Sequence, residues 1–176
     1  MSALETLLER VPEVARDLRL NLGAVLEADS LTAGQRWGVA VAAAHAAGAP
    51  DLARALTEAG RAAGAPEAAF EDARAAAAIM AMNTVYYRFR HMIGKASYAE
   101  RPARLRMHRL AKPATSKADL ELMSLAVAAI HGCEMCVRAH EDVVVKAGLS
   151  EEQVHDAVRA AAVVRGLAQA LALEGA

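Results

Sequence analysis

Three residues in the C-terminal half have the types and spacing of a reactive thiol centre. Cys133 and Cys136 are the two cysteines of the chain, and His140 follows four residues after the second. On a helix this spacing places the imidazole one turn from Cys136 and on the same face, where it can take the thiol proton. Cys133 is two turns from the ring. We therefore expect Cys136 to be the nucleophile and Cys133 to be its resolving partner.

The position of the cysteines along a helix favours their ionised form. We expect Gly132 to end one helix and a second helix to begin at the cysteine pair and run to about Lys146. Free N–H groups and the helix dipole stabilise an anion at a helix N-terminus. Because only the thiolate attacks, this placement favours redox chemistry.

Glu121 supplies a further group to this centre. It opens a predicted helix over 120–131 whose next positions, 122–130, are almost wholly apolar. A carboxylate entering a buried region is costly unless it is paired or hydrogen-bonded. We expect His140 to be the partner, with Glu121 orienting the ring, which is the arrangement of a nucleophile, a base and an orienting group.

Other uses of a close cysteine pair remain open. His140 could be the third ligand of a zinc site, with His91, His108 or His155 as the fourth, although structural zinc sites usually contain more cysteine. An inert buried pair is another alternative. A haem attachment site is excluded, because Val137 stands where the histidine would have to be.

The composition predicts helices to carry these residues. The chain has 176 residues, enough for one domain with a proper core, and its net charge is −1. Apolar residues make up 55% of it, aromatic residues only 3%, and alanine alone accounts for 45 positions. Alanine favours helices and strand-forming residues are scarce. We therefore expect an all-α fold.

Internal similarity suggests two degenerate repeats of a multi-helix motif within one domain, 1–176. The segment from Gln35 resembles the segment from Glu121 at an offset of 86, and a second match follows at an offset of 84. We expect a degenerate repeat at about 32–90 and an active repeat at about 118–174. The cysteines and His140 occur in the second repeat only, so the first is expected to be scaffold.

The chain lacks the sequence marks of a membrane or secreted protein. Its longest stretch without a charged residue, 37–50, is shorter than the ~20 residues of a transmembrane helix. The N-terminus carries an early acid and no apolar signal region. We expect a cytoplasmic protein.

The motif Glu121-x11-Cys133-x2-Cys136-x3-His140 resembles the signature of the AhpD alkylhydroperoxidases, within the larger carboxymuconolactone decarboxylase-like superfamily. The resemblance covers nearly the whole chain. It includes the stretches 17–22, 77–88, 105–107 and 117–122.

The resemblance implies an all-helical, usually trimeric peroxidase without flavin, haem or metal. It implies that Cys136 attacks an alkyl hydroperoxide and becomes a sulfenic acid, that Cys133 closes the disulfide, and that His140 and Glu121 form a proton relay. The implied reductant is a dihydrolipoyl group on a carrier protein, recharged by dihydrolipoamide dehydrogenase, and AhpC peroxiredoxin is an implied partner. A lactone decarboxylase-like enzyme of the same superfamily is the alternative, and it would not need both thiols.

One position departs from the resemblance. Some AhpD proteins carry a histidine directly before the second cysteine, where this chain has Met135. If that histidine shares the relay in those proteins, this chain must use water or His140 alone.

The segment 88–117 is strongly basic. It contains nine Lys or Arg residues and one acid, Glu100. A solvated connector between the halves explains this charge most simply. A docking surface for an acidic carrier domain is the alternative, and nucleic acid is disfavoured because the total charge is balanced.

Overall fold

In the computed structural model, which describes residues 1–173, every regular element is a helix. The predicted all-α fold class is therefore confirmed for these residues. Residue 174, the predicted end of the second repeat, and the end of the chain at 176 lie outside the described part. The elements are α1 Ala3–Glu9, η1 Glu13–Ala15, α2 Asp17–Leu26, α3 Ala33–Ala46, α4 Pro50–Ala62, α5 Glu67–Ile93, α6 Ala96–Ala99, η2 His108–Ala111, α7 Lys117–Ile130, α8 Glu134–Lys146 and α9 Glu151–Leu173.

Helices α3 and α7 form the centre of the core. Both are apolar nearly all round, and their side chains from 37 to 44 and from 122 to 128 are buried. Each packs against the other and against α5 and α9, so all faces are covered. Small residues allow this close packing: a Cβ added to Gly38 of α3 would lie 2.2 Å from Cε of Met123 in α7.

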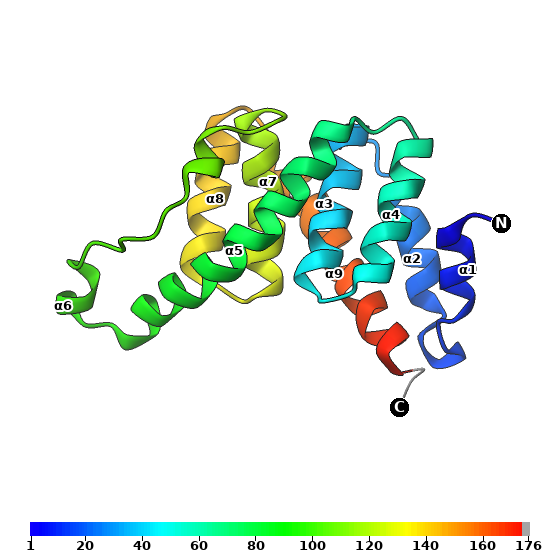
Figure 1. The fold of residues 1–176 in the computed structure, drawn as a ribbon, viewed down its shortest axis with the longest axis horizontal. Helices are drawn as coiled ribbons and strands as arrows, with labels where there is room; N and C mark the ends of the chain where they lie inside the picture. The colour runs from blue at the N-terminus through cyan, green and yellow to red at the C-terminus, as the bar shows by residue number, and fades with distance from the viewer. Residues whose placement is uncertain (174–176) are drawn as a thin grey trace.

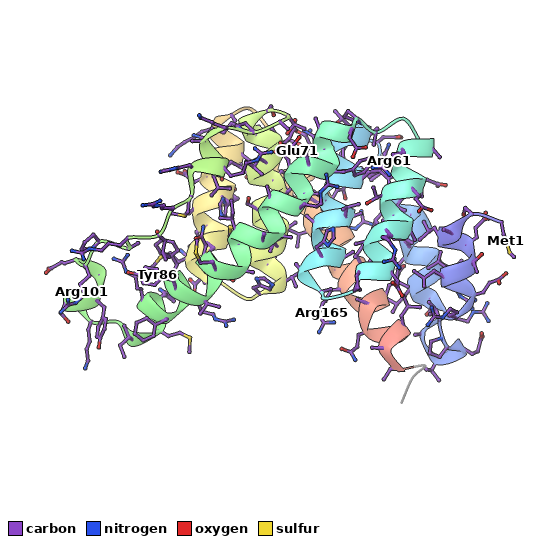
Figure 2. All side chains as sticks on the ribbon, viewed as in Figure 1. Met1, Arg61, Glu71, Tyr86, Arg101 and Arg165 are labelled. Carbon is purple, nitrogen blue, oxygen red and sulfur yellow. A yellow bond between two sulfur atoms is a disulfide. The ribbon has the colours of Figure 1, made fainter. Side chains whose placement is uncertain are left out.

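Helix α5 crosses in front of α7 and α8 and then leaves the bundle (Figure 1). Its outer half, α6 and the chain that follows form a projecting arm, residues 85–107, which returns to the body at η2. Arg101 lies at the far end of this arm and Tyr86 on the outer part of α5 (Figure 2). The basic segment predicted from the sequence therefore lies mainly on the arm.

Local capping explains where the helices begin. Helices α1 and α3 begin with capping boxes: the hydroxyls of Ser2 and Thr32 accept from the third helical amide, and the side chains of Glu5 and Gln35 accept from the amide of the capping residue. Ser150 makes the same pair of bonds with Gln153 before α9. Within the described residues, no helix is long and apolar enough to cross a membrane.

The helix bounds suggest a refinement of the predicted repeat. Helices α3 and α4 and the start of α5 recur as α7, α8 and the start of α9 with a shift of 84 residues, since 33, 50 and 67 become 117, 134 and 151. This shift favours one offset of 84 over the offset of 86 inferred for the first segment. The division of the domain into two repeats stays a prediction.

Asp72 anchors the returning arm to the body. This carboxylate of α5 is fully buried. It accepts hydrogen bonds from the amides of Ala114 and Thr115, from the Thr115 hydroxyl and from Arg109. Burial alone would raise the pKa of Asp72, but these hydrogen bonds together outweigh burial and lower it. The carboxylate thereby holds η2 and the start of α7 in place.

We expect Asp72→Ala to destabilise the protein by about 3 kcal/mol at pH 7, because it leaves several donors without their acceptor. The folded-state pKa is lowered, so the stabilisation is complete above the ordinary carboxyl value of 3.8 and is lost as pH falls below it. Urea unfolding at pH 7 and at pH 3 measures both effects. The exposed neighbour Glu71 is the matched control, and equal losses in Glu71→Ala and Asp72→Ala would contradict the anchor.

Candidate active site

The turn between α7 and α8 places the cysteine pair. Gly132 has a positive φ of 65°, which glycine adopts without strain. Its amide donates to the Ala129 carbonyl and the Cys133 amide donates to the Ala128 carbonyl, which is the Schellman arrangement that ends a helix. Cys133 is then the N-cap of α8, and Cys136 lies in the first turn. The predicted helix from the cysteine pair to Lys146 is confirmed.

Cys133 and Cys136 are joined in a disulfide with their Cα atoms 5.3 Å apart. The two cysteines differ in solvent exposure. Cys133 is completely buried, whereas Cys136 retains 6% of its surface. Cys136 is therefore the side from which a small molecule can approach.

His140 and Glu121 meet, as the sequence analysis expected. Nδ1 of His140 lies 2.5 Å from Oε2 of Glu121, and both side chains are largely buried. Because a carboxylate can only accept, Nδ1 carries the shared proton as a donor and Nε2 remains for proton exchange. The contact joins α7 to α8 and fixes the orientation of the ring.

The predicted start of the helix that carries Glu121 is wrong. The helix begins at Lys117 and not at residue 120, because the hydroxyl of Ser116 accepts from the Asp119 amide and caps it. Glu121 therefore lies in the second turn. From there its side chain reaches α8.

A cavity of about 280 Å³ opens beside Cys136 and His140. It lies between α5, α8 and the returning arm. Cys133 does not line it. Its remaining walls are mostly apolar and consist of Met80, Asn83, Tyr87, Met107, Leu110, Met135 and Ala139.

The α5 wall of this cavity was not predicted from the sequence. Met80, Asn83 and Tyr87 are spaced by three and four residues, so they share one face of α5. This spacing is visible in the sequence and indicates a shared helix face. It does not show which helix the face contacts, so the neighbour in α8 could not be predicted from it.

Helix α5 also holds the turn that carries the cysteines. The Thr84 hydroxyl donates to the Met80 carbonyl, so its 2.9 Å contact with Nδ1 of His131 is one in which it accepts. Arg88 donates to the His131 carbonyl. His131 is the C-cap of α7, next to Gly132, and these two bonds fix the turn from the outside.

Three relatives that are similar to nearly the whole chain share one name. The chain is 64% identical over 171 residues to "Alkyl hydroperoxide reductase AhpD" of Anaeromyxobacter sp. (strain Fw109-5), covering 97% of the chain and 92% of that relative. A protein of the same name from Anaeromyxobacter dehalogenans (strain 2CP-1 / ATCC BAA-258) is 62% identical, covering 99% and 94%. One from Rhodospirillum centenum is 48% identical, covering 99% and 93%. The chain belongs to the AhpD family.

A family model adds the wider relationship. The model of the carboxymuconolactone decarboxylase family matches residues 96–176. This match contains α7, α8 and the cysteine pair. The relatives thus match nearly the whole chain, and the family model matches the part that contains the cysteine motif.

Met135 stands directly before Cys136 in the first turn of α8. Its side chain is 39% exposed and lines the cavity beside Cys136. A thioether has no proton to exchange. At this edge of the site Met135 therefore offers an apolar contact and no exchangeable proton.

The described residues contain no ligand set for the alternative of a zinc site. Within 1–173 no three or more His, Cys, Asp or Glu side chains gather in a way that could hold a metal ion. His91, one proposed fourth ligand, lies on the surface 3.4 Å from Glu134. His140 faces Glu121.

Proposed function

We propose that this member of the AhpD family is an antioxidant thiol peroxidase that reduces alkyl hydroperoxides through Cys133 and Cys136. One observation carries the proposal: Cys136 and a glutamate-oriented His140 line the same apolar cavity. A reactive sulfur, a proton-exchanging ring and space for an alkyl group are thus found together. The names of the relatives agree with this chemistry.

The first step breaks the peroxide bond. In the reduced protein, His140 takes the thiol proton of Cys136 at Nε2, while Glu121 holds Nδ1. The thiolate attacks the terminal peroxide oxygen, so an S–O bond forms and the O–O bond breaks. The alkoxide takes the proton back from His140 and leaves as the alcohol. Cys136 is left as a sulfenic acid.

The second step closes the disulfide and the third reopens it. Cys133 attacks the sulfenic sulfur of Cys136, the S–S bond forms, and hydroxide leaves as water with the thiol proton. A dithiol then reduces the disulfide by two exchange reactions and becomes a disulfide itself. We propose that this dithiol is a dihydrolipoyl group on a carrier, recharged by dihydrolipoamide dehydrogenase, and that reduction of AhpC peroxiredoxin is a further use of the centre.

The burial of the two cysteines supports the division of roles. Cys136 lines the cavity, whereas Cys133 is fully buried beneath the turn. The cysteine that meets an external oxidant must be reachable, and its partner need only reach the first sulfur. Cys136 is accordingly the peroxidatic residue, Cys133 the resolving residue, and neither step calls for a bound cofactor or metal.

The charge of the arm supports docking of an acidic carrier. Lys95, Arg101, Arg104 and Arg106 are exposed there, and Arg101 lies at its far end (Figure 2). Attraction between opposite charges speeds encounter and weakens as salt is added. The arm also returns along the wall of the cavity through Met107, which brings a docked carrier close to Cys136.

An apolar stripe supports assembly into the homotrimer that the family resemblance implies. Met82, Val85, Phe89 and Met92 are exposed on α5 at spacings of three and four residues. Such a stripe is typical of a helix that packs against a neighbour. We propose a cytoplasmic homotrimer in which this face of α5 is covered by another copy.

The experiment is hydroperoxide consumption with dihydrolipoamide, dithiothreitol or thioredoxin as reductant. We expect dihydrolipoamide to support the fastest turnover at equal thiol concentration. With a lipoylated carrier the rate should fall as salt rises, whereas free dihydrolipoamide should show little salt dependence. Reduced protein that consumes no hydroperoxide with any of the three reductants would contradict the proposal.

A further inference from the structure

Asn83 has a buried polar atom without a partner. The side chain retains 5% of its surface, and its Oδ1 has no hydrogen-bond partner. Its Nδ2 has only the weak acceptor Sδ of Met80, at 3.9 Å. Buried amide groups in proteins are nearly always satisfied, so an unsatisfied one needs a reason. A ligand that supplies the missing donor is such a reason.

The position of Asn83 indicates what that ligand is. The residue lines the cavity that also contains Cys136 and His140, and most other walls are methionine, leucine or alanine. A hydroperoxide brings one O–H donor and an apolar group into this space. The O–H needs an acceptor there. Both ring nitrogens of His140 are donors at that stage, because Nδ1 donates to Glu121 and Nε2 carries the proton taken from Cys136. The carboxamide of Asn83 offers a free acceptor.

We infer that Asn83 binds the hydroperoxide by accepting a hydrogen bond from its O–H group, with the alkyl group held against the apolar walls. The inference rests on the proposed peroxidase function and names a residue and a substrate shape for it. Asn83 neither gives nor takes a proton. It holds the terminal oxygen, which is the atom that the Cys136 thiolate attacks, and a cavity of about 280 Å³ favours a compact apolar group.

The test compares two reactions of the same sulfur. Reduced protein is mixed with tert-butyl hydroperoxide and, separately, with iodoacetamide, which does not bring a hydroperoxide O–H. In Asn83→Leu we expect the peroxide rate constant to fall about tenfold or more, the effect of one lost hydrogen bond, while alkylation stays within about twofold. Asn83→Ala should behave in the same way. Asn21→Leu, which alters an exposed asparagine of α2, is the matched control.

A thermal melt separates binding from folding. Because Leu removes an unpaired buried acceptor, Asn83→Leu should melt no lower than wild type. Equal peroxide rates in wild type and both variants would overturn the inference and leave the proposed function standing. Alkylation that falls in step with the peroxide rate would also overturn it, since Asn83 would then act through the thiol or the fold. Wild-type thiols that react with iodoacetamide but with no hydroperoxide would overturn function and inference together.

Discussion

Cys136→Ser should reduce hydroperoxide turnover by a factor on the order of a thousand or more, because a serine hydroxyl is scarcely ionised at neutral pH and cannot attack the peroxide oxygen at a comparable rate. Cys136 is the cysteine that lines the cavity, so its loss removes the attacking atom itself. Consumption of tert-butyl hydroperoxide with dihydrolipoamide as reductant measures the effect.

Cys133→Ser is the matched control for this change. Both variants lose the same disulfide, which closes a very short loop and contributes little to stability, so differences between them report chemistry. Cys133→Ser should still reduce one equivalent of hydroperoxide and then stop as a sulfenic acid, which a dimedone-type probe traps. Sustained turnover in Cys136→Ser would defeat the assignment of the nucleophile. Probe labelling of Cys136→Ser in place of Cys133→Ser would reverse the two roles.

His140→Phe should slow alkylation of the reduced Cys136 thiol about tenfold at pH 7, and Glu121→Gln should slow it in the same direction. The ring receives the thiol proton and the carboxylate holds the ring, so losing either one leaves less thiolate. The upper limit is about thirtyfold, the ratio between a largely ionised thiol and one of ordinary acidity. Iodoacetamide kinetics across pH, in a Cys133→Ser background with one thiol, measure the effect.

The rate in both relay variants should recover at higher pH, because solvent then removes the proton that His140 no longer takes. Glu134→Gln is the matched control: it removes a carboxylate from the first turn of the same helix, away from the Glu121 contact. Loss of that negative charge should leave alkylation unchanged or slightly faster. Normal kinetics at pH 7 in both His140→Phe and Glu121→Gln would remove the relay from the mechanism.

Much of the geometry around the cysteine pair could be predicted, because it depends on residues close in sequence. The turn at Gly132, the helix that follows it and the separation of Cys136 from His140 by one helical turn all depend on residues close in sequence. The contact with Glu121 followed from a different argument, the cost of burying a carboxylate without a partner. The start of that helix was misplaced by three residues, because Ser116 was not recognised as its cap.

By itself, the sequence determined that the chain is helical and that a cysteine pair sits at the start of a helix with a histidine one turn on. Helical periodicity and capping act over a few residues, and their physical rules can be applied directly to the residue string. Only the tertiary structure decided which helix faces pack against each other, because alanine-rich faces are nearly interchangeable as packing partners. The α5 wall of the cavity, with the unpaired oxygen of Asn83 in it, and the attachment of the arm at Asp72 depend on how separate elements pack together, which local sequence rules do not reach.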